Sequence, residues 1–276
     1  MANHRPDPVS IPNVCVRDGS PSRAVLHTLA ISLLAISAFA VPALAENDHP
    51  PAASMDDAVR SETDASKRAP FDIVAAHVHR SGRTVTFHMT LAGEAGSETP
   101  EPAGQLGGAP VLSYVWPTSL DPTTVGFEGG TGILALAATS HPDFDDTPLF
   151  DEDVDGDPAN DGARWHSHWV VLTPTETCGP DALGVRDIPE GETPAMPATW
   201  PGLPIFIDSP GYTPLFDGPE VTINVGFADP SALDGASYDG VTSALKVNAN
   251  VHAPLLCVTD VFDIASGDLS LPGKVR

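Results

Sequence analysis

Apolar and polar residues alternate along several short segments of this chain, which is the pattern of half-buried strands. Val221, Ile223 and Val225 alternate with polar or small neighbours, and the same period of two runs through 241–252. Glycine and proline are dense between such segments, and no long amphipathic helix appears. The pattern predicts an all-β fold, an antiparallel β-sandwich of immunoglobulin-like or jelly-roll-like type with long loops. Further strand candidates are the segments 111–116, 132–138, 165–172, 204–207 and 255–262.

The N-terminal part of the chain has a different pattern. An apolar segment at 24–44 has a core, 29–41, that is too short to span a bilayer. It follows Arg17 and Arg23 and ends in Ala43-Leu44-Ala45, a small-x-small cleavage pattern. We therefore expect a signal peptide at 1–45 rather than a retained membrane anchor, and a periplasmic or secreted protein.

The residues after the expected cleavage site divide into two parts. Residues 46–70 are polar, contain Pro50-Pro51 and show no apolar periodicity, which predicts a disordered linker. Residues 71–276 are enough for one β-sandwich domain with a single core.

Charge narrows the choice of partners. The chain has 13 basic and 37 acidic residues, a formal net charge of −24 at pH 7. Such a surface repels nucleic acid and anionic membranes and attracts cations. Carbohydrate is the other partner class that the sequence leaves open.

Two cysteines, Cys178 and Cys257, remain after the signal peptide. Two is the number needed for one disulfide in an oxidising compartment, and no CxxC spacing favours the alternative of metal-binding thiolates. We expect a disulfide that closes a long loop.

A predicted hairpin at 71–91 carries three histidines. The turn signal at 80–83 places Ser81-Gly82 as a two-residue loop, so that His77 faces Thr86. In this register the polar face carries His77, His79 and His88, close enough for long side chains to converge. Imidazole nitrogens suit zinc and copper, so these three residues are candidate ligands of a transition metal.

A second pair of histidines, His166 and His168, lies on one face of another predicted strand, and both residues are candidate ligands of the same kind. His252 also points to a polar face. The alternative is that these histidines only fill solvated strand faces, and that Trp165 and Trp169 beside the second pair belong to the core.

An acidic loop between these elements predicts a calcium site. Asp151, Asp153 and Asp155, followed by Gly156, match the opening of a calcium-binding loop of the DxDxDG type. The twelfth position is Gly162 instead of a bidentate glutamate, so this is not an EF-hand. A solvated acidic loop is the alternative. The remaining candidate ligands are Asp157 and Asp161, with Asp143, Asp145 or Asp146 to complete the shell.

The segments Phe71-Asp72-Ile73-Val74, Thr84-Val85-Thr86-Phe87 and Leu91-Ala92-Gly93 resemble the first hairpin of extracellular DOMON-like domains and of family 9 carbohydrate-binding sandwiches. The resemblance implies a β-sandwich, and members of those families bind haem or sugars. The resemblance covers about twenty residues and is mainly a strand pattern, so it does not indicate which ligand this protein binds.

Three hypotheses follow. The first is an exported binding protein that is stabilised by calcium and holds a transition metal through its histidines. The second is a zinc-dependent enzyme in which three histidines leave an open metal position for water. The third is a carbohydrate-binding or adhesion module. In the third, a tryptophan would stack on the sugar, and the candidates are Trp116, Trp165, Trp169 and Trp200.

Overall fold

The computed structural model describes residues 57–130 and 132–276. The predicted signal peptide and the first part of the predicted linker lie outside the described residues. Within those residues no helix is long and apolar enough to cross a membrane. The described part of the chain is otherwise all-β, and its short 3₁₀ segments include η2 (Ala69–Phe71), η3 (Pro122–Val125), η4 (Glu176–Cys178) and η5 (Pro230–Leu233).

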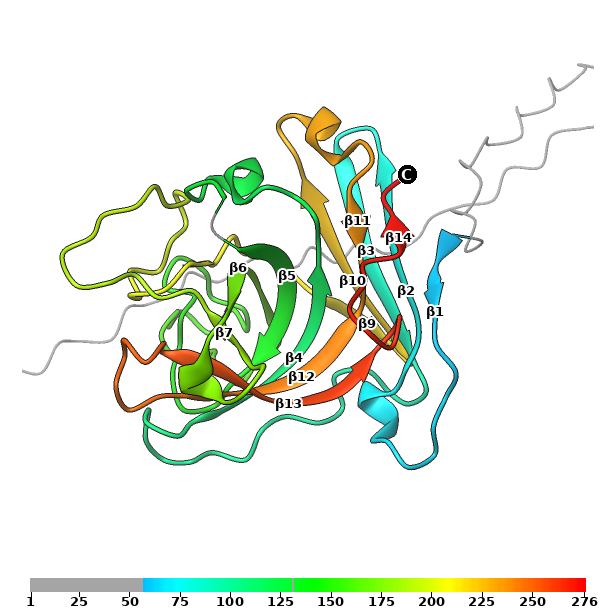
Figure 1. Cartoon of the computed structure of the whole chain (residues 1–276). Helices are drawn as coiled ribbons and strands as arrows, with labels where there is room; N and C mark the ends of the chain where they lie inside the picture. Colours follow the sequence, from blue (N-terminus) through cyan, green and yellow to red (C-terminus); the bar gives the residue numbers. More distant parts are fainter. Residues whose placement is uncertain (1–56, 131) are drawn as a thin grey trace, which may run out of the picture. The chain divides into compact units, whose positions relative to one another are not determined.

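The strands form two large antiparallel sheets and one small one (Figure 1). The five-stranded sheet has the order β1 (Val59–Arg60), β2 (Ile73–Ser81), β3 (Thr84–Leu91), β10 (Glu220–Gly226) and β9 (Leu215–Asp217). The seven-stranded sheet has the order β5 (Ile133–Ser140), β4 (Pro110–Pro117), β12 (Val241–Val247), β13 (Leu256–Ile264), β7 (Leu183–Val185), β6 (His166–Pro174) and β8 (Ile207–Asp208). The third sheet pairs β11 (Ser237–Tyr238) with β14 (Gly273–Lys274).

The seven-stranded sheet closes on itself. β5 pairs with β6 over seven residue pairs, from Ile133–Leu172 to Thr139–His166, so six of the strands form a barrel. The all-β, antiparallel prediction is confirmed, whereas the sandwich type is not, because one of the two layers is a closed barrel. Closure pairs the exposed backbone groups of the two edge strands.

The larger core lies between the five-stranded sheet and the outer wall of the barrel. Phe87 of β3 contacts Trp116 of β4 and Trp169 of β6 edge to face, with ring centroids 6.1 and 5.7 Å apart. A second cluster of smaller side chains lines the barrel interior, including Val111, Ala137 and Leu245. The barrel strands β4, β5 and β6 are therefore buried on both faces, whereas β3 and β10 alternate between buried and exposed residues.

The predicted hairpin is present, with a corrected register. Ser81 pairs with Thr84, so the turn residues are Gly82-Arg83 and His77 lies directly opposite His88. Because the shift moves each pairing by two residues, the apolar side chains keep the face that the sequence predicts. A bulge between Ile73 and Ala75 is the other difference, and it turns Ile73 into the core instead of Val74.

The folded domain begins before Phe71. β1 lies in the second half of the predicted linker and pairs with β2, and Val59 is buried. The Tyr238 hydroxyl also donates a hydrogen bond to the Asp57 carbonyl oxygen. Sequence periodicity cannot detect a strand of two residues, which is why 57–70 were assigned to the linker.

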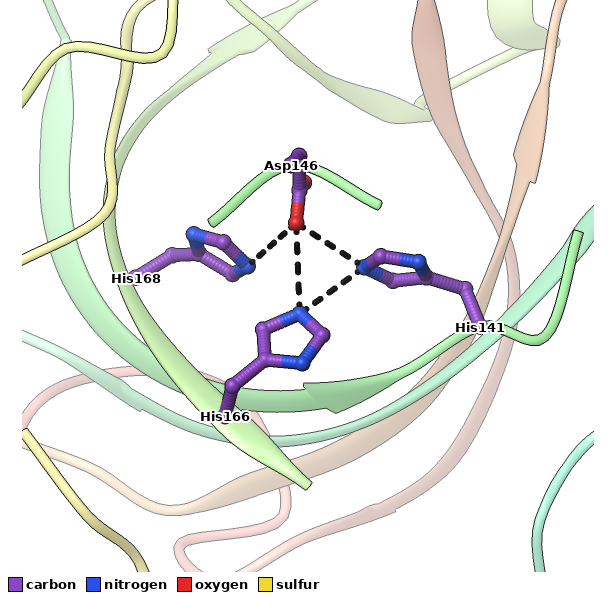
Figure 2. A group of neighbouring side chains, drawn as sticks. All are labelled: His141, Asp146, His166 and His168. Atoms are coloured by element: carbon purple, nitrogen blue, oxygen red, sulfur yellow. Dashed lines mark hydrogen bonds and ion pairs between the residues drawn. The ribbon is translucent and has the colours of Figure 1, made fainter. Parts of the chain in front are cut away.

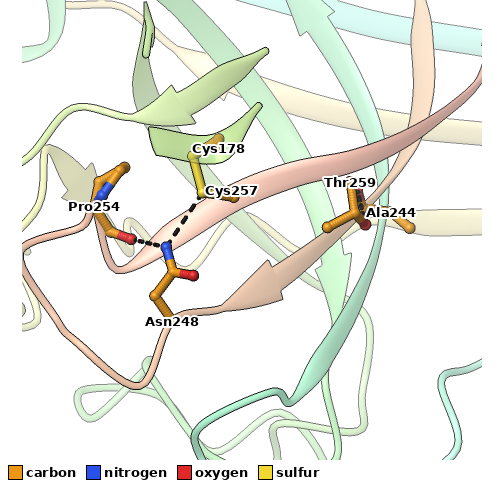
Figure 3. Close-up of a disulfide and its surroundings, with 6 residues drawn as sticks. All are labelled: Cys178, Ala244, Asn248, Pro254, Cys257 and Thr259. Atoms are coloured by element: carbon orange, nitrogen blue, oxygen red, sulfur yellow. Dashed lines mark hydrogen bonds between the residues drawn. A yellow bond between two sulfur atoms is a disulfide. The ribbon is translucent and has the colours of Figure 1, made fainter. Parts of the chain in front are cut away.

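The predicted disulfide is confirmed and closes the weakest seam of the barrel. Cys178 is bonded to Cys257 of β13, with Cα atoms 5.4 Å apart (Figure 3). Between β13 and β7 the only paired residues are Cys257 and Gly184. The disulfide therefore ties η4, which precedes β7 in the chain, to β13 at a place where β7 and β13 share little backbone pairing. The Asn248 amide donates hydrogen bonds to Cys257 Sγ and to the Pro254 carbonyl oxygen beside it.

Candidate metal centre

Four side chains converge at one end of the barrel: His141, Asp146, His166 and His168 (Figure 2). The Asp146 Oδ1 atom lies 3.2 Å from His141 Nε2 and 3.3 Å from the Nε2 atoms of His166 and His168. The Nε2 atoms of His141 and His166 lie 2.9 Å apart. All four residues are at most 4% exposed, so bulk water does not reach this group of polar atoms.

The strand order explains this convergence. His166 and His168 are two residues apart on β6 and therefore share its inner face. His141 directly follows β5, which pairs with β6, and the loop after it turns back to place Asp146 over the histidines. The closure of the barrel at β5 and β6 thus assembles ligands that are up to 27 residues apart in the sequence.

Each imidazole turns its Nδ1 atom to a backbone carbonyl. The acceptors are the carbonyl oxygens of Phe144, Arg164 and Asp208, at 2.9, 2.8 and 3.3 Å from His141, His166 and His168. A carbonyl oxygen only accepts, so Nδ1 carries the proton in each ring and Nε2 is left as an acceptor when the ring is neutral. At His166 the Thr139 hydroxyl lies 3.1 Å from Nε2 and can donate to it. This is the arrangement by which outer-shell groups orient metal-binding histidines.

The Nε2 lone pairs and the Asp146 carboxylate face one another with too few protons between them. His168 Nε2 and Asp146 Oδ1 are buried and have no hydrogen-bond partner, although buried polar atoms are normally paired. A metal with bonds of about 2.0–2.1 Å would separate tetrahedral ligand atoms by about 3.3–3.4 Å. Four of the separations, 2.9–3.3 Å, are close to this value, and all the ligand atoms lie within 4.8 Å of one another. The donor set could therefore hold one divalent ion.

The electrostatics of the cluster are those of a buried charge pair. Burial alone would lower the pKa of His141, but the Asp146 carboxylate outweighs it and raises this pKa above 6.5. Burial would raise the pKa of Asp146, but the positive charges of His168 and His141 hold it well below its usual range. Burial lowers the pKa of His166 to about 4. Without a metal, the carboxylate is thus ionised and His166 stays neutral.

The loop that carries His141 and Asp146 is fixed by close packing. The Phe144 ring stacks on the His141 ring, with centroids 3.9 Å apart. Gly162 accepts a hydrogen bond from the His141 backbone, and a Cβ atom at Gly162 would lie 1.8 Å from the Phe144 carbonyl oxygen. The Ser209 hydroxyl donates to the Asp146 carbonyl oxygen at 2.7 Å. These contacts leave little freedom to the ligands before any metal binds.

The hairpin histidines do not form the predicted site. Among the described residues, two groups of at least three ligand atoms lie within 4.8 Å of one another, and neither contains His77, His79 or His88. The rings of His77 and His79 stack at 5.3 Å, while His88 Nε2 pairs with the Glu220 carboxylate at 2.5 Å. Sharing a strand face thus brings these rings near one another without aiming their nitrogens at one point.

The acidic loop forms the second group. Carboxylate oxygens of Asp151, Asp153 and Asp155 lie within 4.8 Å of one another, in a position open to solvent. Asp157 and Asp161 are not part of the group. Asp161 is buried, and its Oδ2 atom accepts a hydrogen bond from the Glu152 backbone, so its role here is to tie the loop together.

The predicted metal ligands His166 and His168 are therefore in the cluster, and sequence reasoning missed the other two. His141 follows a predicted strand, and its position next to that strand was the available signal. Asp146 lies in the acidic loop, and the sequence does not show which of the nine acidic residues between 143 and 161 are buried. Asp146 is distinguished from the other acidic residues of the loop only by the pairing of β5 with β6, which places it beside the three histidines.

The candidate tryptophans are mostly unavailable for stacking on a ligand. Trp116 and Trp169 are buried in the core between the layers, and Trp165 is half-buried with its indole N–H bonded to the Gly96 carbonyl. Trp200 is 38% exposed. A flat platform of tryptophans is thus not formed by these four residues.

Comparisons of the chain with protein-family models, curated proteins and solved structures find no match. The likeness to DOMON-like and family 9 carbohydrate-binding domains stays a prediction. The fold and site geometry define the class as an all-β protein in which a closed barrel carries a buried three-histidine, one-aspartate cluster. Its function must be argued from that cluster.

Proposed function

We propose that this protein is an exported metalloprotein with one divalent transition-metal ion held by His141, Asp146, His166 and His168. The observation that carries the proposal is the convergence of three Nε2 atoms and one carboxylate oxygen, all buried, with every Nδ1 atom engaged by a carbonyl. A cation at this point would satisfy the two buried atoms that have no hydrogen-bond partner.

The donor set favours zinc among the candidate ions. Three imidazoles and one carboxylate suit zinc and other divalent first-row metals. Copper(I) prefers sulfur ligands, and this cluster has none. Calcium takes six to eight oxygen ligands, which three imidazoles cannot supply. Zinc and copper(II) are therefore the two ions to test first, as the histidine content of the sequence also indicates.

Elemental analysis of the protein purified without chelator tests the proposal. We expect about one equivalent of zinc or another divalent transition metal, since the cluster holds one ion. Asp146→Asn keeps the side-chain shape, removes the charge and should abolish binding. The matched control is Asp187→Asn, which alters a surface pair with His252 and should retain the metal. Metal-free wild type, obtained after growth with added zinc, would overturn the proposal.

His79→Ala separates this site from the hairpin. The structure places His79 away from the cluster, so the variant should keep its full metal content. Loss of metal in His79→Ala with retention in Asp146→Asn would move the site to the hairpin histidines.

A calcium site in the acidic loop is a second proposal, independent of the first. Three carboxylates within 4.8 Å repel one another, and a divalent cation would offset this repulsion. The affinity expected for such an extracellular loop is about 10⁻⁴–10⁻³ M. Calcium should raise the melting temperature of the wild type more than magnesium does, and Asp153→Asn should remove the difference. Equal effects of the two ions would contradict calcium specificity.

A further inference from the structure

The metal centre faces a cavity inside the barrel. The cavity has a volume of about 90 Å³, and all six barrel strands contribute to its wall. Three of the four proposed ligands, His141, Asp146 and His168, line one end. Most of the remaining wall consists of valine, leucine, isoleucine and alanine side chains. A ligand would therefore reach an ion in the metal centre through an apolar cavity.

Small side chains create this space. A barrel of eight strands is just wide enough for its side chains to fill the interior, and a barrel of six is narrower. In this barrel the interior positions near the metal centre are occupied by the small residues Ala137, Ser113 and Ser243. The large aromatic residues lie instead on the outer face of the same strands, as Tyr114 and Trp116 do on β4. The interior is thus left open beside the ligands.

The cavity has one polar end and one apolar end. The Ser113 hydroxyl donates to the Ser243 carbonyl oxygen and lies 2.8 Å from the Ser243 hydroxyl, so the donors of this pair are engaged with each other. His141, Asp146 and His168 are the titratable residues in the wall, and no lysine, arginine or glutamate of the described chain lines it. A charged ligand would lose its hydration without a partner in most of this space.

The wall reaches solvent on the side of β13. Val261 lines the cavity and is 52% exposed. Two irregularities in the pairing of β13 with β12 lie beside Val261, which is opposite Ser243. This part of β13 is therefore the route by which a small molecule would enter.

We infer that the barrel cavity binds a small uncharged molecule, with one oxygen or nitrogen donor atom directed at the metal as a fifth ligand beside the four protein ligands, and a short hydrocarbon chain in the apolar part. This inference rests on the proposed metal site and names the class of its ligand. The volume is below the about 150 Å³ of an engineered apolar cavity that takes up benzene or xenon. The ligand is accordingly shorter than a ring compound with substituents, and a three-carbon alcohol is a suitable probe.

Two probes test the inference separately from metal binding. Xenon needs only the cavity, so the wild type should show a saturable xenon-induced shift in NMR signals from the barrel interior, with or without metal. Val241→Phe fills the cavity from the end away from the ligands and should lose this shift. Val251→Phe, an equal change on an exposed loop, should keep it.

The second probe reports on the metal. In cobalt(II)-substituted protein, propanol should change the visible spectrum in a saturable way, whereas propylammonium, which has the same chain with a charge, should not. If cobalt does not bind, the proposed function fails. If cobalt binds but neither xenon nor propanol has an effect, the metal site stands and the inference is wrong. Equal effects of propanol and propylammonium would also overturn it.

Discussion

His141 and His166 approach to 2.9 Å at their Nε2 atoms, while each turns its Nδ1 atom to a backbone carbonyl. Two such nitrogens attract each other only when a proton or a metal ion lies between them. The position is fixed by β5 and β6, which are paired over most of their length. The backbone of the barrel thus holds these two Nε2 atoms at a separation that is unfavourable unless a cation lies between them.

Metal affinity should depend on pH in a defined direction. The Asp146 carboxylate raises the pKa of His141 above 6.5, so a metal must displace a proton from His141 at acidic pH. We expect the affinity to fall by about tenfold per pH unit below this raised pKa. A competition titration with a chromophoric chelator measures it. An affinity that stays constant from about pH 8 to pH 5 would contradict the role of His141.

The metal-free protein should lose stability on acidification through a different residue. Burial lowers the pKa of His166 to about 4 in the folded state. Below about pH 6.5 His166 becomes protonated in the unfolded chain but stays neutral in the folded protein. The free energy of unfolding therefore falls as the pH drops towards 4. His141, with its raised pKa, acts in the opposite sense, since its contribution is present below 6.5 and is lost as the pH rises through its folded value. Urea unfolding of His166→Gln and wild type should therefore differ in pH slope below about pH 6.5.

Gly162→Ala should destabilise the protein and remove the metal together. The new Cβ would lie 1.8 Å from the Phe144 carbonyl oxygen and 2.6 Å from that of His141, and both are backbone atoms. We expect a loss of about 3 kcal/mol or more in the free energy of unfolding. Gly226→Ala is the control, because no atom lies within 4 Å of the added Cβ. A Gly162→Ala protein with wild-type stability and metal content would show that this loop is not rigid.

Reduction of the Cys178–Cys257 disulfide should destabilise the barrel without removing the metal. The two cysteines are 79 residues apart, and a loop of this length corresponds to about 4–5 kcal/mol in the chain-entropy model. The ligands lie on and around β5 and β6, away from the seam that the disulfide closes. Thermal unfolding and metal analysis of Cys178→Ser/Cys257→Ser check both parts. Loss of metal from the still-folded double variant would contradict this separation.

Export gives a prediction at the other end of the chain. When the full chain is expressed in a bacterial host with a secretion pathway, the exported product should begin at Glu46, following cleavage after Ala45. Mass spectrometry of the periplasmic or secreted protein measures this directly. A product that retains residues 24–44 and stays with the membrane fraction would instead show that this segment is a retained membrane anchor.

Side-chain alternation was sufficient to predict the elements of the solvated sheet. Along 84–91 and 221–227 one face is buried and the other is polar, and the structure has strands β3 and β10 there. The disulfide followed from counting cysteines. In 132–138 and 165–172 both faces are buried, because each strand lines the barrel on one side and packs under a sheet on the other. Such segments are compatible with both a sandwich and a barrel, so the sequence alone could not distinguish these two folds.

The sequence by itself determined the all-β class, the paired cysteines and the common face of His166 and His168, since each depends on the local period of two or on residue counts. The tertiary structure decided which histidines meet. Closure of β5 on β6 brings His141 and Asp146 to that face, whereas His77, His79 and His88 share a face without converging. Neighbouring positions on a sheet bring side chains near one another, but a binding site also needs their donor atoms aimed at a single point, and that depends on long-range pairing.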